Sequence, residues 1–254
     1  MLHIIYRYCN KENNKPRPVF YSKEICLKSL IVALEGLSDF TFSFIGDGVI
    51  NERLQILVNT FAKIEILPEV GNTTSFLYAL SKVWQIPDDD IVYFVEDDYL
   101  HLPEALVKLL DCFGSVNADY VTLYDHPVRY IKNDQVADLP LYNHAIFTSH
   151  LHHWWNVEST CMTFAAKSAT IKADFAIFQQ HTDNHLTPND REIFRHLQGL
   201  GLYADKNTSP MRILVGPIPS LATHCEEPWL APVVDWLSQA TDVAKSTIVG
   251  VNVP

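Results

Sequence analysis

The chain has 254 residues, of which 48% are hydrophobic, and a formal net charge of −11 at pH 7. This size and composition fit one α/β domain, or a core domain with an added lobe. The acidic balance argues against binding to nucleic acid or to anionic membranes, because both need a basic surface.

The cysteines and the apolar segments bear on the cellular setting. The five cysteines are scattered without a CxxC spacing, which is typical of reduced core residues and not of a disulfide framework. No apolar run approaches the roughly 18 residues of a membrane span, and the apolar start is too short for a signal peptide. We therefore expect a cytoplasmic protein without a transmembrane segment, and peripheral membrane contact stays open.

The first 115 residues alternate between expected strands and expected helices. Short apolar runs predict buried strands at 3–8, 41–45, 63–67 and 91–95. Apolar residues at helical spacing predict helices that begin near Ser22, Asn51, Gly71 and Pro103. This alternation predicts an α/β fold with a mainly parallel sheet and helices on both faces.

The second half of the chain is less regular. Strands are expected at 119–124, 144–149 and 159–165, and helices at 168–180 and 188–200. Residues 130–143 are polar and predict a loop, and the part from Asn207 onward is rich in proline and poor in periodicity. No repeat or low-complexity linker divides the chain, so we expect one domain over 1–254.

Three carboxylates, Glu96, Asp97 and Asp98, directly follow the apolar run 91–95. In open α/β sheets, ligands bind just beyond the carboxyl ends of the strands. A divalent cation would neutralise the acids, which are costly to bury unpaired, and would attract a phosphate ligand. The alternative is a solvated acidic turn before the next helix.

Several nucleotide and hydrolase motifs are missing from the sequence. No GxGxxG follows the first expected strand, and neither GxxxxGK[ST] nor GxSxG occurs. A Rossmann dinucleotide site, a P-loop and a hydrolase nucleophile elbow are therefore unsupported.

Four short stretches together resemble nucleotide-sugar glycosyltransferases of the GT-A fold, family-2-like. They are Gly46-Asp47-Gly48, Glu96-Asp97-Asp98, 189–197 and 220–226. The third resembles the ED motif of that family, although Asn189 stands where Glu is usual. The resemblance implies one GT-A-like domain over 1–254, with 1–115 as the nucleotide-binding half and 116–254 as the acceptor-binding half.

The resemblance implies a metal-dependent enzyme that moves a sugar from a nucleoside-diphosphate sugar to a hydroxyl acceptor with inversion. Mn²⁺ or Mg²⁺ would stabilise charge on the departing nucleoside diphosphate. Asp98 and His224 are implied as metal ligands, and a carboxylate with an imidazole suits Mn²⁺ better than Ca²⁺. A structural or solvated His224 is the alternative.

The resemblance also implies a nucleotide-sugar site made of Arg7, Tyr8, Asp47 and Asp97. Each of three residues has a structural alternative. Arg7 can pair with an acid, Asp47 can belong to a tight turn, and Asp97 can cap the next segment.

Asp190 is implied to be the general base that takes the proton of the acceptor hydroxyl. The sequence around it is also typical of a helix start, with Thr187 as the cap and Asp190 in the first turn. Both roles can hold together. His153, Trp154 and Trp155 are expected to contact the acceptor or the sugar, because Trp stacks on sugar faces; core packing is the alternative.

Two other functions compete with glycosyl transfer. A nucleotidyltransferase acting on sugar phosphates usually carries a glycine-rich basic loop near its N-terminus, and residues 7–10 contain no glycine. A non-catalytic sugar- or nucleotide-binding protein on the same fold is the other alternative, and Asn189 in place of Glu keeps it open.

Overall fold

The computed structural model describes residues 1–130, 145–205, 207 and 210–246. The expected polar loop at 130–143 therefore lies almost wholly outside the described residues. Within the described ranges, no helix combines the length and apolar character needed to cross a membrane.

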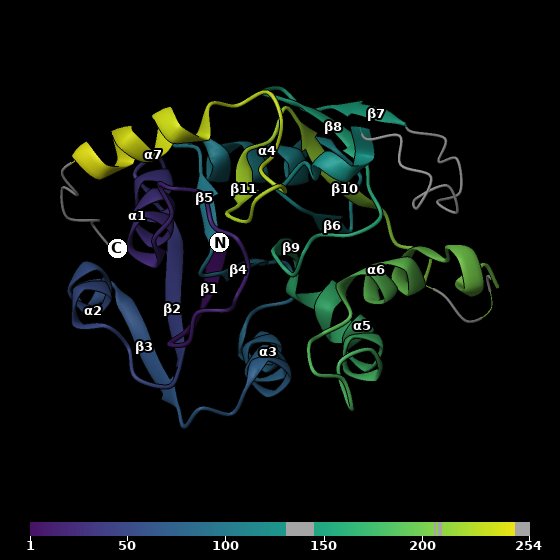
Figure 1. Ribbon diagram of the computed structural model, residues 1–254. Helices are drawn as coiled ribbons and strands as arrows, with labels where there is room; N and C mark the ends of the chain where they lie inside the picture. Colours follow the sequence, from purple (N-terminus) through teal and green to yellow (C-terminus); the bar gives the residue numbers. More distant parts are fainter. Residues whose placement is uncertain (131–144, 206, 208–209, 247–254) are drawn as a thin grey trace.

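Four parallel strands form the first half of the sheet (Figure 1). They are β1 (Leu2–Cys9), β2 (Phe40–Asp47), β3 (Ala62–Leu67) and β4 (Ile91–Glu96). β1 lies between β2 and β4, and its register places Cys9 opposite Asp47 and Arg7 opposite Glu96. Parallel strands end at the same edge of a sheet, so the acidic end of β4 lies beside the ends of β1 and β2.

Helices connect these strands, as the sequence predicted. They are α1 (Lys23–Leu34), α2 (Glu52–Val58), α3 (Asn72–Ser81) and α4 (Ala105–Ser115), with a 3-10 turn after α3 (Lys82–Gln85). The expected caps hold: the side chains of Ser22 and Asn51 accept hydrogen bonds from the N–H groups of Ile25 and Arg53.

The second half of the chain extends the sheet with strands in both orientations. They are β6 (Tyr120–Val121), β7 (Ile146–Thr148), β8 (His153–Asn156), β9 (Phe164–Lys167) and β10 (Leu214–Ile218). The strand order is β3-β2-β1-β4-β9-β6-β10-β8-β7, and β9 runs antiparallel to β4. A separate ladder pairs β5 (Tyr99–His101) with β11 (Ala222–His224). The strand expected at 159–165 is wrong over 159–163, because the observed strand begins only at Phe164 and runs to Lys167.

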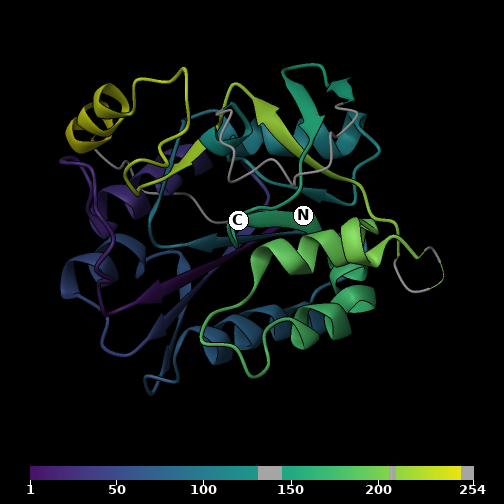
Figure 2. The ribbon, with the colours of Figure 1, turned by 45° about the vertical axis from the view of Figure 1, so that its right-hand side comes forward.

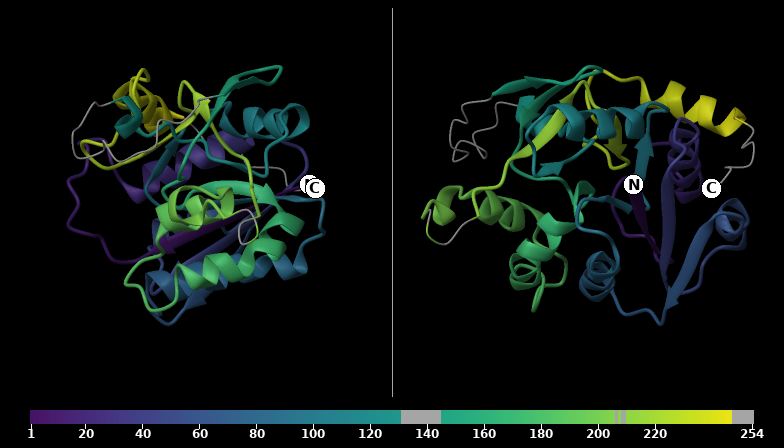
Figure 3. Two further views of the ribbon diagram at one scale, coloured as in Figure 1. Left: turned by 90° about the vertical axis from the view of Figure 1, so that its right-hand side faces the viewer. Right: turned by 180° about the vertical axis from the view of Figure 1, so that it is seen from behind.

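Helices cover both faces of the sheet, as Figures 2 and 3 show. α1, α2, α4 and α7 (Trp236–Lys245) pack on one face, whereas α3, α5 (Ser168–Gln180) and α6 (Asp190–Gln198) pack on the other. Side chains alternate along each strand, so Tyr6 belongs to the first core and Ile5 to the second. The predicted α/β fold with helices on both faces is confirmed.

The C-terminal part contains more structure than the sequence analysis expected. β10, β11 and α7 all follow Asn207, and two 3-10 turns (Pro127–Tyr130 and Gly201–Tyr203) interrupt the loops before them. A local signal for α7 exists: Asp235 caps it, and Trp236, Ala240 and Val243 are buried at spacings of four and three residues. The short strands are fixed by their partners and not by local sequence.

Candidate functional site

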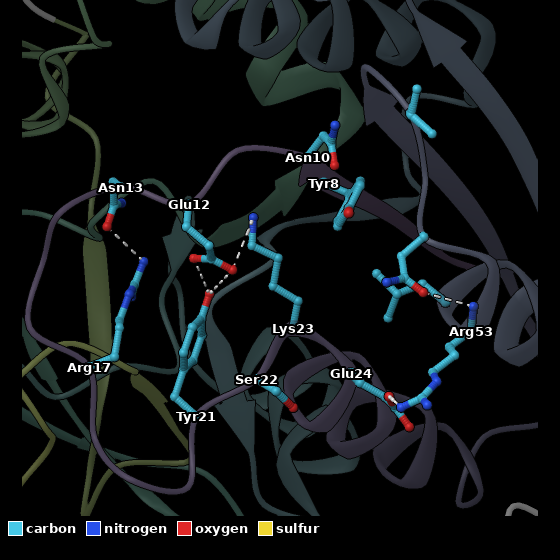
Figure 4. Close-up of a pocket in the computed structure, with 13 residues that line it drawn as sticks. Tyr8, Asn10, Glu12, Asn13, Arg17, Tyr21, Ser22, Lys23, Glu24 and Arg53 are labelled. Atoms are coloured by element: carbon cyan, nitrogen blue, oxygen red, sulfur yellow. Dashed lines mark hydrogen bonds and ion pairs between the residues drawn. The ribbon is translucent and has the colours of Figure 1, made fainter.

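A pocket of about 670 Å³ opens at the carboxyl edge of the parallel strands, beside the end of β1 (Figure 4). Its wall is made by the segment after β1, the start of α1, and the chain around the start of α2. The lining residues include Tyr8, Asn10, Arg17, Lys23 and Arg53. Glu12 and Glu24 also line it, so three cations face two carboxylates there. In an acidic chain, this local excess of positive charge favours an anionic ligand.

The first two acids of the triplet are held by cations from β1 and α1. Arg7 forms an ion pair with Glu96. The Nζ of Lys23 lies 3.0 Å from Oδ2 of Asp97, and the N–H of Cys9 donates to the same oxygen at 2.8 Å. Burial raises the pKa of Glu96 to about 7 and that of Asp97 to about 6, although the neighbouring cations oppose this rise. Both carboxyls thus help to hold β1, β4 and α1 together.

The third acid, Asp98, lies against His224, which is 126 positions away in the sequence. The Nε2 of His224 is 3.0 Å from Oδ2 of Asp98. The β5–β11 ladder brings the two together, because it pairs His224 with Tyr99, the neighbour of Asp98. The ring of Tyr99 also stacks on the imidazole, with 5.3 Å between centroids. The structure therefore brings together the two residues that the resemblance implied as metal ligands.

Asp98 has one engaged oxygen and one orphaned oxygen. Arg17 donates through Nη1 to Oδ2 at 3.0 Å and to the carbonyl of Cys225 at 2.7 Å. The other oxygen, Oδ1, is buried and accepts no hydrogen bond from any described residue. Burial alone would raise the pKa of Asp98, but His224 and Arg17 outweigh burial and hold the pKa well below its usual range. Asp98 is therefore ionised, and its Oδ1 atom is still available to accept a hydrogen bond or to bind a cation.

The side chains around Asp98 fit a divalent cation whose remaining ligands come from the substrate and water. Among the described residues, no group of three or more His, Cys, Asp or Glu side chains is arranged to hold a metal. Mg²⁺ and similar ions are nevertheless often held by one or two protein ligands together with substrate phosphates and water. The orphaned Oδ1 of Asp98 and the imidazole of His224 would supply those protein ligands.

The residues implied for nucleotide binding are distributed over different places. Tyr8 lines the pocket, with Nζ of Lys23 5.2 Å from the centre of its ring. Asp47 instead accepts hydrogen bonds from the N–H groups of Val70 and Gly71, at 2.7 and 2.9 Å, which fixes the chain ahead of α3. Arg7 and Asp97 serve the ion pairs described above, and none of these three lines the pocket described here.

Asp190 is the first residue of α6, and its carboxylate is hydrogen-bonded to residues of a preceding turn. It accepts hydrogen bonds from the N–H groups of Thr160, Cys161 and Met162 at 2.9–3.0 Å. The hydroxyl of Thr160 donates a fourth, at 2.6 Å. Cys161 and Met162 both have positive φ, 50° and 61°, so the carboxylate stabilises a turn that non-glycine residues rarely adopt. Asn189, and not Thr187 as expected, caps the helix through its side chain.

The aromatic cluster at 153–155 lies mostly inside the protein. Trp154 is completely buried and donates its indole N–H to the hydroxyl of Ser149 at 3.0 Å. Trp154 therefore packs in the core here, as in the structural alternative, and its contact with an acceptor or sugar stays a prediction. Trp155 is 8% exposed and stacks on Tyr130, with 5.7 Å between centroids. His153 is exposed at the start of β8.

Arg17 and Lys23 were not among the site residues predicted from the sequence. Both contact the acid triplet and line the pocket. A weak signal was present, since basic residues are concentrated after the first strand of an otherwise acidic chain. The Thr160–Met162 turn gave no signal, because it contains neither glycine nor asparagine.

No protein-family model and no curated protein matches the chain significantly. Among solved structures, it is similar to S. aureus TarS 1-349, with 15% identity and a TM-score of 0.44 over 76% of this chain and 54% of that chain. The complex of TarS 1-349 with UDP gives 15% identity and a TM-score of 0.42, over 72% and 52%. Glucosyl-3-phosphoglycerate synthase from Mycobacterium tuberculosis, in complex with phosphoglyceric acid, gives 12% and 0.48, over 96% and 77%. The chain thus spans about half the length of TarS 1-349.

Proposed function

We propose that this protein transfers a glycosyl group from a nucleoside-diphosphate sugar to a hydroxyl acceptor. One observation carries the proposal: a buried Asp98–His224 pair with an orphaned carboxylate oxygen, joined through Arg17 to a pocket. The pocket volume lies within the range of about 300–1,000 Å³ that is usual for ligand sites. The excess of cations over carboxylates in the lining supports an anionic donor such as a nucleoside diphosphate.

Asp98 and His224 would hold Mn²⁺ or Mg²⁺ in this proposal. A bound metal would stabilise the negative charge that develops on the leaving diphosphate. Arg17 and Lys23 would bind phosphate oxygens from the pocket side, and the ring of Tyr8 would contact the nucleoside.

The chemical step exchanges one bond at the anomeric carbon. The bond from this carbon to the diphosphate oxygen breaks, and its electron pair leaves with the nucleoside diphosphate. The acceptor oxygen forms the new bond and loses its proton to a base. We expect inversion, as in the family that the sequence resembles. For Asp190 to be that base, one of its four donors from the Thr160–Met162 turn must give way to the acceptor hydroxyl.

A turnover assay tests the proposal. The protein is incubated with Mn²⁺, a panel of nucleoside-diphosphate sugars and a panel of hydroxyl acceptors, and both the released nucleoside diphosphate and the glycosylated product are measured. Thermal shift with each donor first selects the donors that bind, since a bound ligand raises the melting temperature by mass action. Stoichiometric formation of both products is the expected result, and donor binding without product would overturn the transferase assignment.

The second candidate is a nucleotide- or nucleotide-sugar-binding protein that does not catalyse transfer. The observation that favours it is the carboxylate of Asp190, which is occupied by the chain's own donors. The same assay separates the two functions, because a binding protein would show the donor-dependent thermal shift and release no nucleoside diphosphate.

A further inference from the structure

Arg17 is part of both the pocket and the ion pair with Asp98. Its side chain lines the pocket, and its guanidinium contacts Oδ2 of Asp98 at 3.0 Å. The side chain is only 15% exposed. In Figure 4 it lies at one end of the pocket, with Arg53 at the other end. Arg17 therefore connects the ligand pocket to the Asp98–His224 pair.

The contacts of Arg17 leave two buried atoms unpaired. Its Nη1 contacts Asp98 and the carbonyl of Cys225, its Nη2 donates to Asn13 at 3.2 Å, and the ring of Tyr21 lies 4.5 Å from the guanidinium carbon. The Nε of Arg17 is buried with no hydrogen-bond partner among the described residues, and so is Oδ1 of Asp98. A buried donor or acceptor without a partner lowers the stability of the protein. A ligand that paired with these two atoms would remove that cost.

A metal ion and a phosphate group would together satisfy both atoms. A divalent cation on Asp98 would engage the orphaned carboxylate oxygen, and a phosphate would accept from the orphaned N–H of Arg17. A cation on Asp98 would also repel the guanidinium that now contacts the same carboxylate. Arg17 stands in a segment without helix or strand, between β1 and α1, and its long side chain already faces the pocket.

We propose that Arg17 pairs with Asp98 before metal and nucleotide bind, opposing the metal through its charge, and moves onto the diphosphate when they bind. The inference rests on the proposed function for its ligands, a divalent cation and a nucleoside diphosphate. It makes Arg17 a competitor of the metal before the nucleotide arrives and a partner of the nucleotide afterwards. Removal of Arg17 should therefore strengthen the binding of metal alone and weaken the binding of nucleotide.

The test is Arg17→Gln, which removes the charge and retains a polar side chain. Mn²⁺ binding is measured without nucleotide, by the electron paramagnetic resonance signal of free Mn²⁺, and UDP and GDP binding is measured by calorimetry in saturating Mn²⁺. We expect Mn²⁺ alone to bind about 5- to 150-fold more tightly to the variant, the usual range for coupling between two sites. The affinity for the preferred diphosphate should fall about 10- to 100-fold, because charge-assisted hydrogen bonds are lost.

Two further variants control the experiment. Arg53→Gln removes a cation from the opposite end of the pocket; Arg53 is exposed, lies 3.9 Å from Glu24 and makes no ion pair with Asp98. Its affinity for Mn²⁺ alone should equal that of the parent. Arg17→Lys keeps the charge and should return the affinity for Mn²⁺ alone toward the parental value. The thermal midpoint of each variant reports whether it is folded.

Each outcome decides one part of the inference. Unchanged or weaker Mn²⁺ binding in Arg17→Gln would overturn the competition, and unchanged diphosphate binding would overturn the movement onto phosphate. If neither parent nor variant binds Mn²⁺, the inference and the metal part of the proposed function both fail. If Mn²⁺ binding changes as expected while the parent transfers no sugar, the inference stands and the transferase assignment falls.

Discussion

Asp98 and Asp190 are two carboxylates that the family resemblance assigns to one active site, and the chain treats them differently. Asp98 is held by two side chains, Arg17 and His224, and keeps one buried oxygen without a donor. Asp190 is held by three main-chain N–H groups and the hydroxyl of Thr160. Side chains can rotate away when a ligand arrives, whereas backbone donors leave only if the turn refolds. Asp98 is thus equipped to exchange partners, and Asp190 to hold a turn in place.

The largest effect is expected from Asp98→Ala. Loss of residues that merely support a metal ligand commonly costs 10–100-fold in metal affinity, so loss of a ligand itself should cost at least about 100-fold. Calorimetry with a nucleoside diphosphate and Mn²⁺ measures the effect. Asp89→Ala is the matched control, because Asp89 is an acid near the other end of β4 with a 99% exposed side chain. Equal affinity in Asp98→Ala and the parent would remove Asp98 from the site.

The next effect is expected from Asp190→Asn, and it concerns stability. Asn has one carbonyl oxygen, and its NH₂ group would face N–H donors of the Thr160–Met162 turn. Each buried donor left unpaired costs about 1–3 kcal/mol, so the free energy of unfolding should fall by at least that amount. Urea denaturation measures this, and Mn²⁺-dependent diphosphate affinity should persist. Parental stability combined with abolished transfer would instead establish Asp190 as the base.

A smaller effect is expected from Thr160→Val, which removes one of the four donors to Asp190 and keeps the shape of the side chain. Loss of this hydrogen bond should lower the free energy of unfolding by about 1 kcal/mol. Thr182→Val is the control, because the hydroxyl of Thr182 is buried without a hydrogen-bond partner in the described residues. This control should be neutral or stabilising. An equal fall in the free energy of unfolding of both variants would contradict a stabilising hydrogen bond from Thr160 to Asp190.

The sequence predicted the acidic strand end and the sheet around it, because these depend on local patterns. Buried strands followed by helices specify parallel order, and parallel order brings strand ends to one edge. The candidate site could not be predicted from local patterns alone. The meeting of Asp98 with His224 depends on the β5–β11 ladder, whose strands have three residues each and no detectable periodicity. Only the family resemblance indicated that pairing.

The predicted strand at 159–165 failed for a related reason. Thr160, Cys161, Met162 and Thr163 have the β-branched and apolar character of a strand, so propensity favours the extended state. The carboxylate of Asp190 instead stabilises left-handed backbone at Cys161 and Met162, from a position about 30 residues later in the sequence. A contact of this kind is tertiary, and local propensity carries no information about it.

The β5–β11 ladder has a consequence for the order in which this protein matures. During synthesis the N-terminal elements leave the ribosome first, so β1–β4 and the pocket wall can assemble early. His224 follows Asp98 by 126 positions and is delivered by one of the last strands. Until that strand docks, Asp98 has Arg17 as its counterion but no imidazole beside it. A nascent chain that has not reached β11 lacks this imidazole, so the Asp98–His224 pair forms only after nearly all of the chain is made.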